Sequence, residues 1–180
     1  GLLKRGILES YEKEVGRLQV SVCRLQEPNP LSPAQEKAYG EIHEAFKTKE
    51  VCLLHGVTSS GKTEIYVRLI HEVLRLGRQV LYMLPEIAIT TQITERLAKL
   101  FGDKLLVYHS KFSDNERVEV WNRLLHTGEP MLVLGVRSSL FLPFKDLGLI
   151  IIDEEHENTY KQQDPAPRYH ARNAALVLAG

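Results

Sequence analysis

An α/β sandwich built around a mainly parallel sheet is the fold that this sequence predicts. Short, almost unbroken apolar runs alternate along the chain with segments of helical periodicity. Strands that are apolar on both faces are typical of a parallel sheet covered by helices on its two sides. The runs of strand length lie at residues 51–55, 80–84, 105–108, 131–134 and 149–152. We therefore expect five strands with intervening helices in a three-layer sandwich.

Amphipathic helices are predicted between these runs. Residues 62–76 and 90–101 repeat apolar residues every three or four positions, and a glycine follows each segment and favours a helix end there. Ser113 and Glu116 have the spacing of a capping box at the start of a third helix. Strands and helices in regular alternation are the units from which parallel α/β folds are built.

Composition and punctuation indicate one globular domain with a short appendage. The chain has 180 residues, 43% of them apolar, and its 23 basic residues balance 23 acidic ones. This balance argues against a protein that depends on phosphate contacts alone, although it permits a local groove for nucleic acid. Pro28 and Pro30 mark a linker at residues 28–30, since proline interrupts a continuous helix. We expect the remnant of a preceding domain at residues 1–27 and the α/β domain at residues 31–180.

The sequence also predicts where the protein works. No apolar run approaches the roughly 18 residues that a membrane-spanning helix needs, so no membrane association is expected. The two cysteines, Cys23 and Cys52, fit a reducing compartment better than a disulfide scaffold. These features favour the cytoplasm.

A complete P-loop motif follows the first apolar run. Residues 56–63 satisfy the pattern G-x-x-x-x-G-K-[ST], in which glycines let successive backbone N–H groups converge on phosphate oxygens. Lys62 is expected to contact the β- and γ-phosphates, and the Thr63 hydroxyl to bind Mg²⁺. A helix that begins near Lys62 adds the positive end of its dipole. The expected nucleotide-binding residues of the motif are Gly56, Thr58, Ser59, Ser60, Gly61, Lys62 and Thr63.

An acidic pair follows the most apolar run of the chain. Residues 149–152 lead directly into Asp153 and Glu154, which places two carboxylates at the carboxyl end of a predicted strand. Open α/β sheets bind their ligands at that edge. Asp153 is expected to organise Mg²⁺ and Glu154 to polarise the attacking water, with Lys62, Asp153 and Glu154 as the catalytic set of a RecA-like P-loop NTPase.

With both motifs placed, the chain resembles superfamily 2 helicases of the DExH type, and among them the replication-restart helicases of the primosome. The resemblance covers roughly residue 31 to the end, and its most specific block runs from Asp153-Glu154-Glu155-His156-Glu157 through Tyr160-Lys161-Gln162-Gln163 to Arg168-Tyr169-His170-Ala171-Arg172. Other matching stretches are 56–66, 84–90, 109–110 and 136–144. The chain departs from the family at Val136, where threonine is usual, which affects one expected hydroxyl contact to phosphate.

The resemblance implies site residues that spacing does not reveal. Glu64 joins the nucleotide-binding set, and Gln35 is implied to recognise adenine. Ser32 and Gln35 also fit a capping box with Pro33 at the first helical position, and the sequence leaves both roles for Gln35 open. Aromatic rings and cations in residues 160–170 suit a single strand, because rings stack on bases and cations meet phosphates. The implied DNA contacts are Pro85, Thr90, Arg137, Ser138, Tyr160, Lys161, Arg168 and Tyr169.

The resemblance further implies ATP and Mg²⁺ as cofactors, with zinc only in another part of a longer parent protein. Its implied partners are single-stranded or forked DNA and other primosome or single-strand-binding proteins, in a bacterial cytoplasm. Residues 1–27 resemble the tail of a winged-helix DNA-binding module. A second lobe would supply an arginine for hydrolysis, so this chain alone is expected to be almost inactive. The alternatives are a P-loop ATPase that is not a helicase and a catalytically silent DNA-binding or scaffold module.

Overall fold

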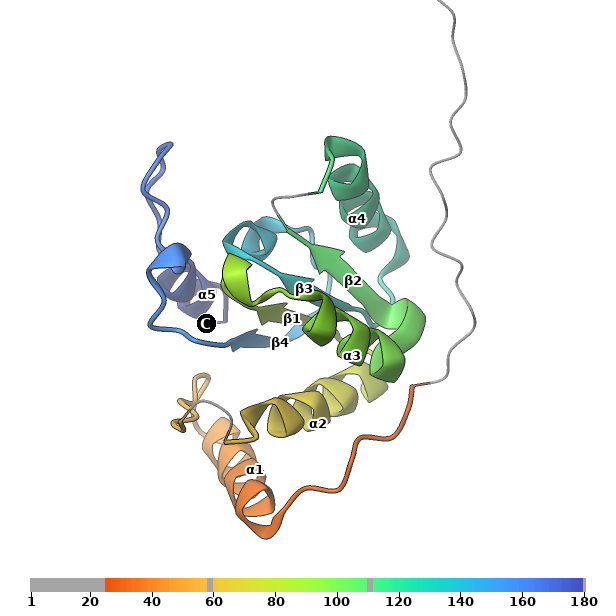
Figure 1. Ribbon diagram of the computed structural model, residues 1–180, viewed down its shortest axis with the longest axis vertical. Helices are drawn as coiled ribbons and strands as arrows, with labels where there is room; N and C mark the ends of the chain where they lie inside the picture. The colour runs from red at the N-terminus through yellow and green to blue at the C-terminus, as the bar shows by residue number, and fades with distance from the viewer. Residues whose placement is uncertain (1–24, 58–59, 110–111, 180) are drawn as a thin grey trace, which may run out of the picture.

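The chain folds into a parallel sheet with helices on both faces. The computed structural model describes residues 25–57, 60–109 and 112–179, so all but the last three residues of the domain remnant predicted at residues 1–27 lie outside these ranges (Figure 1). Its helices are α1 (Pro33–Phe46), α2 (Lys62–Arg75), α3 (Thr91–Phe101), α4 (Asp114–Thr127) and α5 (Ala171–Ala179). Short 3₁₀ turns named η2 (Glu86–Ala88), η3 (Gly102–Lys104), η4 (Arg137–Phe141) and η5 (Asn158–Tyr160) connect several of them.

Four parallel strands form the sheet that the described residues contain. They are β1 (Gln79–Met83), β2 (Leu105–Tyr108), β3 (Leu132–Gly135) and β4 (Leu147–Ile152), in the spatial order β2-β3-β1-β4. Every pair is parallel, and Met83 lies beside both Gly135 and Ile152. The predicted α/β class and four of the five expected strands are therefore confirmed.

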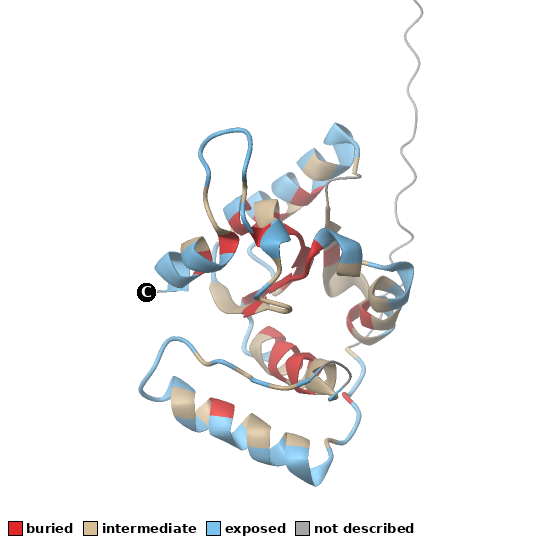
Figure 2. Ribbon diagram, turned by 60° about the vertical axis from the view of Figure 1, so that its left-hand side comes forward, coloured by how far each residue is buried: buried red, intermediate tan, exposed pale blue. Residues whose placement is uncertain are grey.

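Alternate side chains of β1 enter the cores on the two faces of the sheet. Val80 and Tyr82 belong to a cluster with α2 and α3, whereas Leu81 and Met83 belong to a cluster with α4 and α5. The five residues of β1 are all at most 1% exposed. Figure 2 shows this buried centre between exposed helix faces. Burial on both faces explains why the predicted strands are apolar on both sides.

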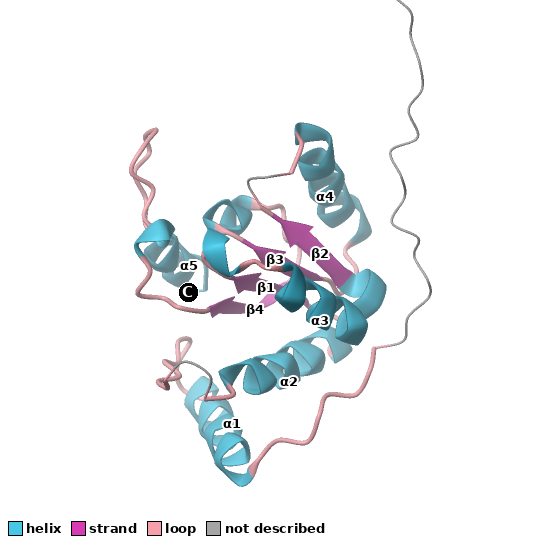
Figure 3. Cartoon of the chain, in the orientation of Figure 1, coloured by secondary structure: helices cyan, strands magenta, loops and turns pink. Residues whose placement is uncertain are grey.

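The predicted strand at residues 51–55 is wrong. These residues form a loop that stands apart from the sheet between α1 and α2 (Figure 3), with Leu53 exposed to 75% and Val51 to 51%. The intervening residues Cys52 and Leu54 pack against the small core between α1 and α2. Part of the apolar run that resembles a buried strand is thus covered by helices instead of neighbouring strands. A cavity of about 380 Å³ separates the loop from β4, so the two segments do not form a ladder of hydrogen bonds within the described residues.

Two helix starts are fixed by the capping boxes that the sequence predicts. The Ser113 side chain accepts a hydrogen bond from the Glu116 backbone N–H, and the Glu116 carboxylate accepts one from the Ser113 N–H. The Ser113 hydroxyl, which donates to the same carboxylate at 2.7 Å, and then the Ser113 N–H lower the pKa of the Glu116 carboxyl group. Ser32 and Gln35 form the same arrangement at α1, with Pro33 in the first turn.

None of the helices in residues 25–57, 60–109 and 112–179 is long and apolar enough to cross a membrane.

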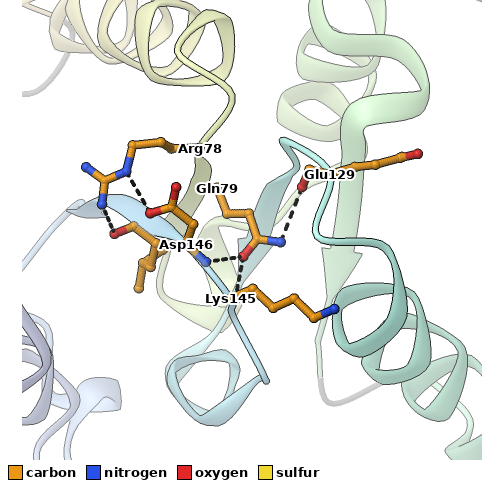
Figure 4. A network of polar contacts seen from close by, with 6 residues as sticks. Arg78, Gln79, Glu129, Lys145 and Asp146 are labelled. Atoms are coloured by element: carbon orange, nitrogen blue, oxygen red, sulfur yellow. Dashed lines mark hydrogen bonds and ion pairs between the residues drawn. The ribbon is translucent and has the colours of Figure 1, made fainter.

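A buried glutamine joins three chain segments at the amino-terminal edge of the sheet (Figure 4). The Gln79 side chain, in a residue only 1% exposed, donates to the Glu129 carbonyl at 3.2 Å. Its oxygen accepts from the backbone N–H groups of Lys145 at 2.8 Å and Asp146 at 3.3 Å. Arg78 adds an exposed ion pair to the Asp146 carboxylate at 2.8 Å. This network fixes the approach of β4 to β1.

Gln79→Ala should lower the free energy of unfolding by about 2 to 3 kcal/mol, because it removes a buried side chain and leaves three part-buried backbone groups without this partner. Arg78→Ala, which removes the neighbouring exposed ion pair, should cost less than about 1 kcal/mol. Urea unfolding followed by circular dichroism measures both. Equal losses in the two variants would contradict the role given to the Gln79 amide.

Candidate nucleotide-binding site

The candidate site lies where the strands end and α2 begins. Its cavity of about 380 Å³ lies between the loop at residues 51–57, the start of α2, β4 and the turn at residues 153–156. Lys62, Asp153 and Glu154 all line this cavity, although they come from distant parts of the sequence. The structure therefore brings the predicted catalytic set together at the carboxyl edge of the sheet.

Gly61 makes the turn from the P-loop into α2. Its φ angle of 80° lies in the left-handed region that favours glycine. A Cβ atom at this position would lie 2.4 Å from the Gln35 side-chain nitrogen. Gly61 is also the N-cap of α2 and supplies no side-chain cap, so the first N–H groups of the helix face the loop as an anion site would require. The predicted contacts Thr58 and Ser59 lie outside the described residues, and Ser60 is exposed beside them.

Gln35 connects α1 to this turn. Its oxygen accepts a hydrogen bond from the Ser32 N–H at 2.8 Å, while its nitrogen donates to the Gly61 carbonyl at 3.0 Å. The capping role left open by the sequence is therefore present, and the same side chain also holds the P-loop. Adenine recognition by Gln35 stays a prediction.

Lys62 folds back over the P-loop. Its ammonium group donates to the Gly56 carbonyl at 2.6 Å and to the Val57 carbonyl at 3.2 Å. These carbonyls are weaker partners for the charge than a phosphate would be. The lysine is consequently in place to exchange backbone carbonyls for phosphate oxygens, with the start of α2 beside it.

Asp153 is held at both carboxylate oxygens. The Glu154 backbone N–H donates to Oδ1 at 3.0 Å, and the Tyr82 hydroxyl donates to Oδ2 at 3.1 Å. Glu154 has a φ angle of 50°, which is uncommon for a residue other than glycine and marks a sharp turn directly after β4. Its carboxylate lies 3.6 Å from the His156 Nε2 atom.

Three tyrosines surround Asp153, and the motif-based analysis missed the roles of Tyr66 and Tyr82. Tyr82 belongs to β1, and Tyr66 of α2 packs edge-on against it with ring centroids 5.7 Å apart. The Tyr160 hydroxyl donates to the Met83 carbonyl at 3.1 Å and to the Asp153 carbonyl at 2.7 Å. Burial, and then the negative charge of Asp153, raises the pKa of all three hydroxyls, which remain protonated donors at neutral pH. A tyrosine within the otherwise aliphatic run 80–84 was the available sequence signal.

The residues present fit Mg²⁺ bound together with a nucleotide. The described residues contain no cluster of three or more His, Cys, Asp or Glu side chains that could hold a metal ion alone. Mg²⁺ commonly needs only one or two protein oxygens, because phosphates and water complete its shell. Asp153 provides a fixed carboxylate, and Thr63 lies one residue after Lys62 in the first turn of α2.

Glu64 is paired away from the cavity. Its carboxylate forms an ion pair with Arg96 of α3, which ties α2 to α3. A direct contact between Glu64 and a nucleotide would have to compete with this partner.

The predicted DNA contacts after β1 and β3 lie at the same edge of the sheet. Pro85 is buried at the start of η2, and Thr90 is the exposed N-cap of α3. Arg137 begins η4 and donates to the carbonyls of Thr159 and Lys161, both at 3.0 Å. Ser138 follows it and is half-buried. Arg137 therefore holds the loop that contains the remaining predicted contacts.

That loop has a buried anchor and an exposed outer part. Tyr160 is only 1% exposed, so a base cannot stack on its ring in this structure, and the residue acts as the anchor. Lys161 and Arg168 are exposed. Tyr169 is half-buried and packs edge-on against Phe141 of η4, with ring centroids 4.9 Å apart.

The sequence of the whole domain matches one family of known proteins. The model of the DEAD/DEAH box helicase family matches residues 32–176. This span includes the P-loop, the acidic pair and every strand described above. The chain belongs to the DEAD/DEAH box helicases.

Within that family, the chain is similar to replication restart proteins named PriA, as the sequence resemblance predicted. It is 44% identical to the protein of Bacillus subtilis over 182 residues, which cover 99% of the chain and 22% of that relative. It is 43% identical to the Synechocystis protein over 176 residues, or 97% of the chain and 21% of the relative. The Haemophilus influenzae protein is 46% identical over 151 residues, or 83% and 20%. The chain thus spans about a fifth of the length of these curated relatives.

A solved structure supports the fold. An ATP-dependent Type ISP restriction-modification enzyme, LlaBIII bound to DNA, superposes with a TM-score of 0.56 over 84% of this chain and 12% of its own. The sequence identity is 20%, so the likeness concerns the fold alone. It agrees with the predicted RecA-like sandwich.

Gly61→Ala should lower the free energy of unfolding by about 1 to 2 kcal/mol, since alanine is strained at this positive φ angle and its methyl group would displace Gln35. Gly40→Ala is a matched control in the middle of α1, where a methyl group meets no atom within 4 Å. That variant should gain about 0.5 to 1 kcal/mol. Chemical denaturation compares the two, and opposite signs are expected. A neutral Gly61→Ala would show that the turn tolerates a side chain.

Proposed function

We propose that this chain is the ATP-binding lobe of an ATP-dependent DNA helicase that acts in replication restart and primosome assembly. One observation carries the proposal: a P-loop lysine and an Asp-Glu pair line the same cavity, at the edge where three parallel strands and α2 meet. Membership of the helicase family and the similarity to PriA proteins support the assignment to DNA rather than to another substrate.

Each member of the site has a proposed task. Lys62 leaves the carbonyls of the P-loop and contacts the β- and γ-phosphates of ATP. Thr63 would hold Mg²⁺ through its hydroxyl group, and Asp153 would hold it through a carboxylate that two hydrogen bonds restrain. Glu154 polarises the attacking water from the turn after β4. Gln35 recognises adenine. For this task its side-chain nitrogen would give up the hydrogen bond to the Gly61 carbonyl and donate to the base instead.

Single-stranded DNA is the proposed partner of the neighbouring edge. Thr90, Lys161 and Arg168 present exposed polar or positive side chains there, and Arg137 holds the loop that contains Lys161 and Arg168. Such an arrangement suits the phosphate backbone more than base edges. A strand that attracted Arg137 would release the carbonyls of Thr159 and Lys161, next to the Tyr160 anchor beneath Asp153.

The wider role extends the same proposal to the longer proteins that resemble this chain. The parent protein translocates along single-stranded or forked DNA and contacts other primosome or single-strand-binding proteins. Any zinc lies in a part of the parent outside this lobe. A second lobe supplies the arginine that completes hydrolysis, so the chain alone binds nucleotide with little turnover. The relatives are bacterial, and we place the action in the bacterial cytoplasm.

Lys62→Ala should reduce the affinity of the 180-residue chain for a fluorescent ATP analogue by at least about tenfold in the presence of Mg²⁺, because it removes the phosphate-binding charge. Lys145→Ala is the matched control, since Lys145 is exposed at the opposite edge of the sheet. Fluorescence anisotropy measures both affinities. Equal, negligible binding by wild type and Lys62→Ala would favour a silent scaffold module.

Arg168→Ala combined with Lys161→Ala should weaken binding of the chain to a single-stranded oligonucleotide. The slope of log affinity against log salt should also become less steep by about 0.7 for each lost phosphate contact. Lys145→Ala again serves as the control. Anisotropy with labelled oligonucleotide at several salt concentrations gives the slopes, and an unchanged slope would remove these two residues from the DNA surface.

A further inference from the structure

A tyrosine in the centre of the sheet reaches the acidic end of the neighbouring strand. Tyr82 lies on β1, which has a neighbouring strand on each side, and it pairs in register with Ile151 of β4. Its hydroxyl extends to Oδ2 of Asp153, two residues further along, at 3.1 Å. A residue of the buried core thus makes direct contact with a residue of the candidate site.

The Tyr82 ring has little room to move. It is 1% exposed and belongs to the core cluster that α2, α3 and the sheet enclose. Tyr66 packs edge-on against it at an interplanar angle of 64°. Close packing therefore fixes the hydroxyl oxygen through the rigid ring, whereas a flexible donor would lose conformational entropy in holding the same position.

The hydrogen bond defines the orientation of the Asp153 carboxylate. One oxygen accepts from the Glu154 N–H and the other from Tyr82, so each end of the carboxylate has a donor that restrains its plane. An ionised carboxylate has about four acceptor positions, and the Tyr66 hydroxyl also hydrogen-bonds to this one, so a position remains for a further ligand. The direction of that position is determined once the plane is fixed.

We propose that Tyr82 is a positioning residue, which holds the Asp153 carboxylate in the orientation that a magnesium–nucleotide complex requires. The inference rests on the proposed function, because it assumes that Asp153 faces the metal. Partners of this kind affect metal affinity without touching the metal, and their loss costs about 10- to 100-fold.

The chain contains a second tyrosine–carboxylate pair that serves as an internal comparison. The Tyr39 hydroxyl donates to the Glu72 carboxylate at 2.7 Å, between α1 and α2. Both pairs add a hydrogen bond to the folded state. Only the pair of Tyr82 and Asp153 ends in a residue that lines the cavity. A purely structural role predicts similar consequences for the loss of either hydroxyl, whereas a positioning role predicts a difference in metal dependence.

The test is a magnesium titration of nucleotide binding by the 180-residue chain. Tyr82→Phe removes the hydroxyl and keeps the ring, and it should raise the Mg²⁺ concentration needed for half-maximal binding of a fluorescent ATP analogue by about tenfold. Tyr39→Phe should leave that midpoint unchanged. In an Asp153→Asn background, Tyr82→Phe should produce no further change, because it acts through that carboxylate.

The outcomes separate this inference from the proposed function. If wild type shows no saturable nucleotide binding, the proposed site itself fails. If wild type binds nucleotide and Tyr82→Phe leaves the Mg²⁺ midpoint unchanged, only the role of Tyr82 is overturned. The same holds if Tyr82→Phe shifts the midpoint equally in the Asp153→Asn background.

A second measurement avoids any dependence on a folded variant. In the wild-type chain, the Tyr82 hydroxyl proton should be detectable by NMR as a slowly exchanging signal. Mg²⁺ added to the nucleotide complex should shift this signal and leave that of Tyr39 in place. A Tyr82 signal that does not respond would overturn the proposal.

Discussion

β1 is hydrogen-bonded along both edges, and the parallel register of its two neighbours fixes where the site can form. Met83 lies beside Gly135 of β3 and Ile152 of β4, so the three strands end at one level. The ladder continues past these ends, because the Leu84 N–H donates to the Gly135 carbonyl and the Asp153 N–H to the Met83 carbonyl, both at 3.0 Å. The residues that follow each strand therefore emerge together. A parallel sheet whose central strand is completely buried permits no other register without moving its apolar side chains.

This shared edge allows the acidic turn and the loop at residues 158–170 to depend on each other. The Tyr160 hydroxyl bonds to carbonyls of both β1 and the residue after β4, while Arg137 after β3 bonds to carbonyls on either side of Tyr160. The loop is consequently attached to all three strand ends through its backbone and one buried ring. A displacement of the loop would disturb the hydrogen bond from the Tyr160 hydroxyl to the Asp153 carbonyl. The geometry provides contiguous contacts between a proposed DNA surface and a proposed metal ligand, which is a physical route for coupling.

Local signals predicted the four strands of the sheet, and the errors have physical reasons. Continuous apolar runs identified β1 to β4, because burial on both faces leaves no alternation. The same criterion failed at residues 51–55, where Cys52 and Leu54 bury against helices and no neighbouring strand is available. Sequence separation also concealed the tyrosines around Asp153, since contacts from Tyr66 and Tyr82 depend on strand order rather than on spacing. Tyr160 matched an aromatic motif, but only the fold shows that its ring points inward.

Gln35 makes two structural contacts through the two ends of its amide group. An amide has an acceptor and donors at different ends, and here its oxygen completes the capping box while its nitrogen holds Gly61. Capping uses the oxygen alone, so the nitrogen is available to exchange the Gly61 carbonyl for a ligand without ending the cap. Gly61 in turn is the residue after which α2 begins, and Lys62 is the next residue. This hydrogen bond thereby links α1 to the turn at the start of α2. An event that draws the Gln35 nitrogen away would free the carbonyl that borders the P-loop lysine.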